Sequence, residues 1–109
     1  MDQITKTVQS LGIYSTYPGS CYLIDAVRLV LEREDMLLSI CCELYPSIAK
    51  LHNTTPDHVE RNIRAVVDHC WEGKNRTVLE HIFPYPIVSK PYSGEIIDAL
   101  AEYCKKTHD

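Results

Sequence analysis

Glycine is scarce in this chain of 109 residues: there are four, and none belongs to a Gly-rich loop of the kind that cradles a nucleotide phosphate. The five histidines are scattered, and no serine or cysteine lies in a recognisable nucleophile setting beside a histidine and an acid. These absences argue against an enzyme and against nucleotide binding of the usual kinds. We therefore expect no cofactor.

Long apolar runs are also missing. No stretch is long enough to span a bilayer, and the N-terminus, MDQITKTVQSLG, lacks the basic start and apolar core of a secretion signal. Charge blocks and low-complexity runs are absent, while the hydrophobic content of 45% is normal for a globular chain. A chain of this length has room for one core. We expect a single domain, residues 1–109, that stays in the cytoplasm and does not contact a membrane.

Cysteine is plentiful by comparison, with five residues at positions 21, 41, 42, 70 and 104. Their odd number and their spacing fit neither a disulfide framework nor paired metal ligands. Cys41 and Cys42 lie inside the apolar run MLLSICCEL, so we expect reduced, mostly buried thiols and no bound metal. A small redox- or metal-responsive regulator that uses Cys41 and Cys42 with a nearby histidine is the alternative that these thiols leave open.

Apolar spacing and turn residues predict helices and hardly any strand. Ser20 and Ser93 are plausible helix caps, and Gly73 can end a helix in a left-handed conformation. The sum is a compact all-α domain of six to seven helices. The expected helices run over about Gln3–Leu11, Ser20–Glu34, Asp35–Tyr45, Pro46–His52, Pro56–Trp71 and Arg76–Phe83, with a last one from Ser93.

The most informative stretch is YPSIAKLHNTTPDHVERNIRAVVDHCW, from Tyr45 to Trp71, which reads as two helices joined by a tight polar turn. A proline opens each helix, where its missing N–H has no intrahelical partner to lose. Between them, Asn53 tolerates a left-handed conformation and Thr55 can cap the second helix. The pattern predicts a helix-turn-helix over about residues 46–72.

The second helix of this pair has two distinct faces. Its apolar residues recur at spacings of four and three and form one stripe, while charged residues share that spacing on the opposite side. A helix that buries one stripe and presents Arg, Glu and His from its N-terminal half fits a major-groove reader, although an ordinary surface helix gives the same pattern. The stripe is Val59, Ile63, Val66 and Cys70; the opposite face carries Asp57, Arg61, Arg64 and Asp68, flanked by His58 and Glu60.

The strings YPSIAKLHNTT and VERNIR, followed by Trp71, resemble the C-terminal effector domain of the stage zero sporulation protein A family, the response regulators that start sporulation in Gram-positive bacteria. The resemblance covers nearly the whole chain and implies a sequence-specific DNA-binding transcriptional regulator. It is carried further by Leu11-Gly12-Ile13, Tyr22-Leu23, Ala26-Val27, Phe83, Tyr85, Lys90-Pro91 and Glu95.

The same resemblance implies which residues contact double-stranded DNA. Arg61 and Arg64 can donate to guanine or phosphate in the major groove, and Glu60 can accept from cytosine. Thr55, Lys50 and Lys90 are placed to contact phosphates, and His58 stands where the family carries an arginine. The expected DNA-contacting residues are Lys50, Thr55, His58, Glu60, Arg61, Arg64 and Lys90.

Charge is the main departure from the family. Residues 46–72 hold three lysines and arginines against four acids, and the whole chain has a formal charge of −4. Because phosphate neutralisation supplies most non-specific affinity, we expect weaker or more salt-sensitive binding. Asp57 and Asp68 could also pair with Arg61 and Arg64 along the helix. The alternative is a protein-interaction module of the same fold, with weakened or lost DNA binding, that modulates a full-length regulator.

In the family, a phosphoacceptor receiver domain holds the effector back until phosphorylation drives dimerisation. These residues contain no counterpart of it, so we expect either a segment of a longer chain or a standalone effector. The partners implied are a homodimer or tandem assembly on DNA and, beyond that, a full-length regulator or RNA polymerase.

Overall fold

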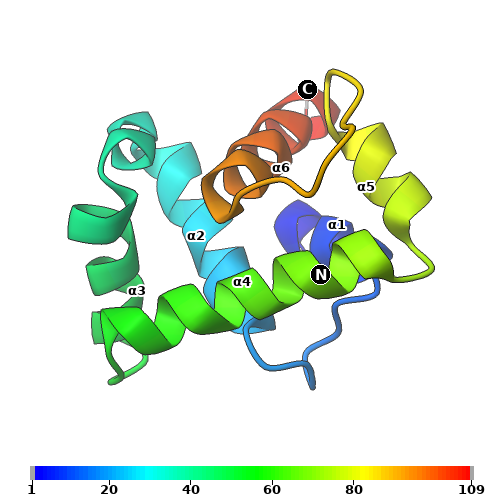
Figure 1. Ribbon diagram of the computed structural model, residues 1–109. Helices are drawn as coiled ribbons and strands as arrows, with labels where there is room; N and C mark the ends of the chain where they lie inside the picture. The colour runs from blue at the N-terminus through cyan, green and yellow to red at the C-terminus, as the bar shows by residue number, and fades with distance from the viewer. Residues whose placement is uncertain (1, 109) are drawn as a thin grey trace.

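The computed structural model describes residues 2–108, and the side chains of residues 2–106, as helices joined by short connections (Figure 1). No strand occurs in this part of the chain, which confirms the all-α prediction. The α-helices are α1 (Gln3–Ser10), α2 (Ser20–Glu32), α3 (Tyr45–Leu51), α4 (Pro56–Glu72), α5 (Arg76–Ile82) and α6 (Ser93–His108), and a 3₁₀ helix, η1 (Glu34–Leu38), and a π-helical turn, η2 (Ile40–Leu44), link α2 to α3.

The core forms around α2, which packs against α1, α3, α4 and α6. Its apolar residues recur every three or four positions, and Leu23, Ala26, Val27 and Val30 are each at most 1% exposed. The long helix α4 runs across one side of this arrangement in Figure 1 and contributes its whole predicted stripe to the core. Burial of these stripes, and not helix propensity, stabilises helices of this length.

The segment between α2 and α3 differs from the prediction of one regular helix over Asp35–Tyr45. It forms η1, then a break at Ser39, then η2, in which the Leu44 N–H donates to the Ser39 carbonyl five residues back, at 3.2 Å. Met36 and Leu44 are buried by this path. The chain has no glycine or proline here, so its sequence gives no local sign of the break.

The expectation of mostly buried cysteines was wrong for three of the five. Cys21, Cys41 and Cys42 are exposed, whereas Cys70 and Cys104 are buried. Because η2 turns Leu44 inward, the adjacent free cysteines Cys41 and Cys42 face solvent. No group of three His, Cys, Asp or Glu side chains within the described residues is arranged to hold a metal ion.

Two helix ends also differ from expectation. Gly19, not Ser20, caps α2, with a left-handed φ of 93°, and a Cβ at this position would lie 2.6 Å from the Asn62 carbonyl oxygen of α4. Only glycine permits both that conformation and that approach. Gly73 ends α4 in an extended conformation, with φ −87° and ψ −179°, and not in the left-handed one. None of the helices over residues 2–108 is long and apolar enough to cross a membrane.

The cysteine environments predict the order of thiol reactivity. We expect a colorimetric thiol reagent at mildly alkaline pH to titrate Cys41 and Cys42 first in the native protein. Partial burial, aided by the nearby Asp25 carboxylate, raises the pKa of Cys21, so less thiolate is present and its reaction is slower. Burial raises the pKa of Cys70 to about 12, so that Cys70, like the buried Cys104, reacts only on unfolding. Five thiols reacting at one fast rate in the native protein would contradict these environments.

Candidate nucleic-acid interface

Helices α3 and α4 form the predicted helix-turn-helix, with the turn over residues 52–55. Helix α3 ends at Leu51, and Asn53 then adopts the left-handed conformation, with φ 53°. The Thr54 N–H donates to the Ala49 carbonyl at 2.9 Å and closes the helix end. The turn chemistry predicted from the sequence is therefore confirmed.

The start of α4 is capped as predicted. Thr55 has an extended backbone, and its hydroxyl oxygen accepts a hydrogen bond from the His58 N–H at 3.2 Å. Pro56 follows as the first helical residue. This cap satisfies one of the helix's unpaired N–H groups and fixes where α4 begins.

Contacts with α2 hold the turn in place. The His52 ring lies 2.5 Å from the Asp25 carboxylate, through Nε2 and Oδ2. The ring of Tyr22 packs edge-on against His52 and His58, with centroids 5.0 and 5.8 Å away. Together with the close approach at Gly19, these contacts set the position of the N-terminal half of α4 over α2.

Arg61 lies in the N-terminal half of α4, on the face opposite the buried stripe. Its side chain is exposed and has no ion-pair or hydrogen-bond partner among the described residues. Arg64, one turn nearer the helix end, pairs with Glu60 at 2.8 Å. The pairs that spacing allows with Asp57 and Asp68 do not form, since neither acid binds an arginine of α4.

Asp68 binds Lys90 instead, with Nζ and Oδ1 2.6 Å apart. This contact ties the loop before α6 to the C-terminal half of α4. It also closes one side of a surface hollow of about 520 Å³, which we call the α4 hollow. The α4 hollow is lined by side chains that include Tyr45, Glu60, Arg64, Asp68, Lys90 and Tyr92.

The structure thus brings three of the predicted residues together, since Glu60, Arg64 and Lys90 all line the α4 hollow. His58 lies on the other flank of α4, where its backbone carbonyl accepts a hydrogen bond from the side-chain amide of Asn62 at 2.7 Å. Lys50 is exposed in the last turn of α3, close in sequence to Thr55. Of the seven predicted residues, five therefore lie at the start of α4 or along its N-terminal half, whereas Lys50 lies on α3 and Lys90 on the loop before α6.

Two features of the α4 hollow were not predicted. Tyr92 lies beside Lys90 and is 81% exposed. The sequence signal that could have pointed to it is an aromatic residue two positions after a candidate phosphate contact. Tyr45 is buried at the hollow's inner side, and this burial raises the pKa of its hydroxyl, while a hydrogen bond with Ser93 acts in the opposite direction. The phenol therefore stays neutral and able to donate at physiological pH.

The charge around α4 is mixed. Asp57, Arg61 and Glu72 are all exposed on it, and the Arg76 guanidinium lies over the Trp71 ring, 3.4 Å from its centroid. Each guanidinium on or beside α4 thus has acidic or aromatic neighbours within a few residues. Such a surface attracts phosphate less than a purely basic one does, and salt screens that attraction further.

A helix-turn-helix whose second helix buries one stripe and presents arginines from its N-terminal half is the architecture of a helical DNA-binding domain. Residues 4–104 match the sequence model of the family described as the C-terminal domain of the sporulation initiation factor Spo0A. The chain belongs to this family. It is a family of DNA-binding effector domains of a sporulation regulator and not a family of enzymes.

The Thr55 cap predicts a measurable stability effect. Thr55→Ala should lower the free energy of unfolding by about 1 kcal/mol, because the His58 N–H loses its acceptor. Urea unfolding followed by circular dichroism gives this value. Thr55→Ser keeps an oxygen in the same place and should retain most of the stability. Equal losses in the two variants would show that the threonine methyl, and not the cap, stabilises the helix start.

Proposed function

We propose that this domain is a sequence-specific transcriptional regulator that inserts the N-terminal half of α4 into the major groove of double-stranded DNA. The observation that carries the proposal is Arg61, an exposed guanidinium with no partner among the described residues. It lies on the outward face of the N-terminal half of α4, whose start is fixed by the Thr55 cap. A guanidinium in this position can donate two parallel hydrogen bonds to the O6 and N7 of guanine.

Glu60 and Arg64 act as a second reading unit on the flank of α4. The two residues are one helical turn apart and their ion pair is exposed, so replacing the pair by DNA contacts costs only about 0.3–0.5 kcal/mol. On release, Arg64 can reach a phosphate or a second guanine, and Glu60 can accept from the amino group of cytosine. The pair leaves both side chains accessible on the surface of α4.

The remaining predicted residues position the domain on the phosphate backbone. Thr55 and the first N–H groups of α4 lie at the positive end of a helix of 17 residues, where an anion is stabilised. His58 lies in the first turn of α4, Lys50 lies in the last turn of α3, and Lys90 lines the α4 hollow. Contacts of this type fix register and orientation but do not read sequence.

The first test is fluorescence anisotropy with a labelled duplex that carries the operator box of the Spo0A family and with a scrambled duplex, each at low and near-physiological salt. The wild-type chain should prefer the box at both salt concentrations. Arg61→Ala should lose this preference, at a cost of about 1–3 kcal/mol, because one bidentate base contact is removed. Arg33→Ala is the matched control: it is an exposed arginine on the connection after α2, paired with Asp35 and Glu43, and should leave binding unchanged.

Equal, salt-abolished binding to both duplexes, or no binding, would overturn sequence reading of this operator. Selection from a random duplex pool then distinguishes a different operator from lost DNA binding, which is the interaction-module alternative. A duplex with two tandem boxes, compared with one, tests whether the chain assembles on DNA as a homodimer or tandem pair, which the family resemblance implies.

Asp68→Asn should tighten DNA binding by about twofold to fivefold at low salt, because it removes a negative charge from α4 and releases Lys90. The gain should shrink as salt rises, since screening weakens contributions from exposed charges. Glu32→Gln, an exposed acid at the end of α2, is the control and should change little. An unchanged affinity for Asp68→Asn would show that neither Asp68 nor Lys90 lies near bound DNA.

A further inference from the structure

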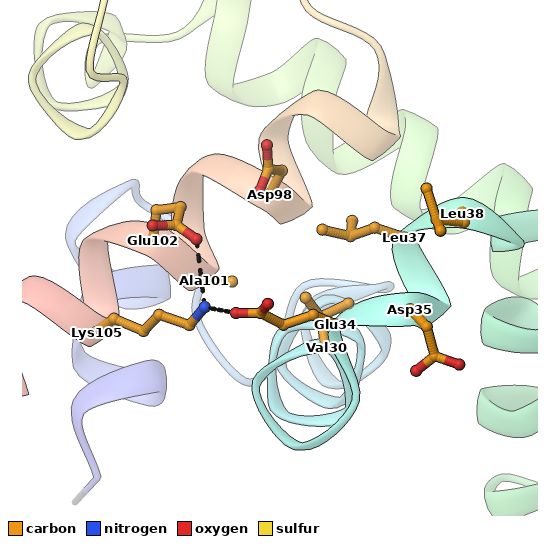
Figure 2. A pocket seen from close by; sticks show the side chains of 9 residues that line it. All are labelled: Val30, Glu34, Asp35, Leu37, Leu38, Asp98, Ala101, Glu102 and Lys105. Carbon is orange, nitrogen blue, oxygen red and sulfur yellow. Dashed lines mark hydrogen bonds and ion pairs between the residues drawn. The ribbon is translucent and has the colours of Figure 1, made fainter.

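A groove with an apolar floor runs between η1 and α6, on elements that carry none of the predicted DNA-contacting residues. Its volume is about 350 Å³. Val30 and Ala101 form buried parts of its wall, each 1% exposed, while Leu38 is 88% exposed at its lip. Figure 2 shows Leu37 and Leu38 on one side of the groove and α6 along the other. Leu38 thus extends the apolar lining of Val30, Leu37 and Ala101 to the surface, and a contiguous apolar patch with a polar rim is a candidate protein-binding surface.

The rim of this groove is acidic. Four carboxylates and a single ammonium group line it, namely Glu34, Asp35, Asp98, Glu102 and Lys105. The Lys105 ammonium reaches across from α6 to bind Glu34 of η1, and it also lies 3.3 Å from Glu102 (Figure 2). Asp35 binds Arg33, whereas Asp98 has no ion-pair partner among the described residues. The rim therefore has an excess of negative charge that a cationic ligand could balance.

The shape and lining of the groove restrict what can bind. The described residues contain no strand edge to which a peptide strand could be added, and the groove has no aromatic side chain to receive a polyproline segment. Its charge has the wrong sign for a phosphorylated or acidic motif. Two helices form its walls, so the remaining recognition mode is an amphipathic helix laid along it.

We propose that the groove between η1 and α6 is a docking site for a cationic amphipathic helix of a partner protein. Apolar side chains from one face of that helix would cover Leu37 and Leu38, and its lysines or arginines would bind Asp98 and the carboxylates now shared with Lys105. A helix is about 10–12 Å wide, so only one face would enter the groove. A second copy of this chain, with a formal charge of −4, complements an acidic rim less well than a cationic helix does. The proposal does not depend on DNA binding.

The test uses the full chain and defined helical probes. The main probe is a labelled, end-capped peptide of about 14 residues, roughly four turns, built from leucine and lysine with the leucines on one face. One control peptide replaces each lysine by glutamate, and another scrambles the order so that no apolar face forms. Fluorescence anisotropy at near-physiological salt measures the dissociation constants. Only the cationic amphipathic peptide should bind.

Two groove variants and two matched controls locate the binding. Leu38→Asp should weaken binding about tenfold or more, because it removes most of the exposed apolar contact. Asp98→Lys should weaken it roughly fivefold through charge reversal at the rim. Leu51→Asp changes another leucine, 66% exposed on α3, and Glu80→Lys reverses an exposed carboxylate on α5; each should change binding less than about twofold. All four positions lie on the surface, so the variants should fold, and circular dichroism checks this.

Amide shifts in nuclear magnetic resonance spectra should map the peptide to residues 30–38 and 98–105. Equal weakening by Asp98→Lys and Glu80→Lys would overturn the proposal, because it would indicate diffuse charge attraction. Equal weakening by the two leucine variants, shifts centred elsewhere, or no binding would overturn it as well. Self-association of the chain that Leu38→Asp abolishes would show that a second copy, and not a partner helix, occupies the groove.

Discussion

The burial of one stripe of α4 is the constraint on which the candidate DNA-binding surface depends. Val59, Ile63, Val66 and Cys70 are fully buried, so the rotation of α4 about its own axis is fixed. Every other residue of the helix then has a defined direction. Arg61 faces solvent, Glu60 and Arg64 face the α4 hollow, and His58 and Asn62 face the start of α2. Gly19 completes this constraint, since any larger residue would push α2 and α4 apart.

Much of this arrangement could be predicted from the sequence because it depends on neighbours within one or two turns. The Asn53 conformation, the Thr55 cap and the stripe of α4 all follow from local rules about turns and helical spacing. Three helices begin at the predicted residues, namely Gln3, Pro56 and Arg76. Where the backbone follows its local preference, the prediction needs no knowledge of the rest of the fold.

The parts that could not be predicted depend on contacts between distant segments. Lys90 and Asp68 are 22 residues apart, and only the path of the loop before α6 makes them neighbours. That contact occupies Asp68, the acid expected to bind Arg64, and Arg64 binds Glu60 instead. The exposure of Cys41 follows in the same way from the π-helical turn, which turns Leu44 into the core and has no marker in the local sequence.

Cys41 also lines the α4 hollow beside the residues proposed to read DNA. The Cys41 thiol is therefore a natural attachment point for a label on the candidate DNA-binding surface. A fluorophore or spin label attached there would stand next to Glu60 and Arg64. Replacing Cys21 and Cys42 would make that attachment selective, because Cys70 and Cys104 are already buried. A label at Cys41 would therefore report on α4, the helix proposed to read DNA, without any new residue being introduced into that helix.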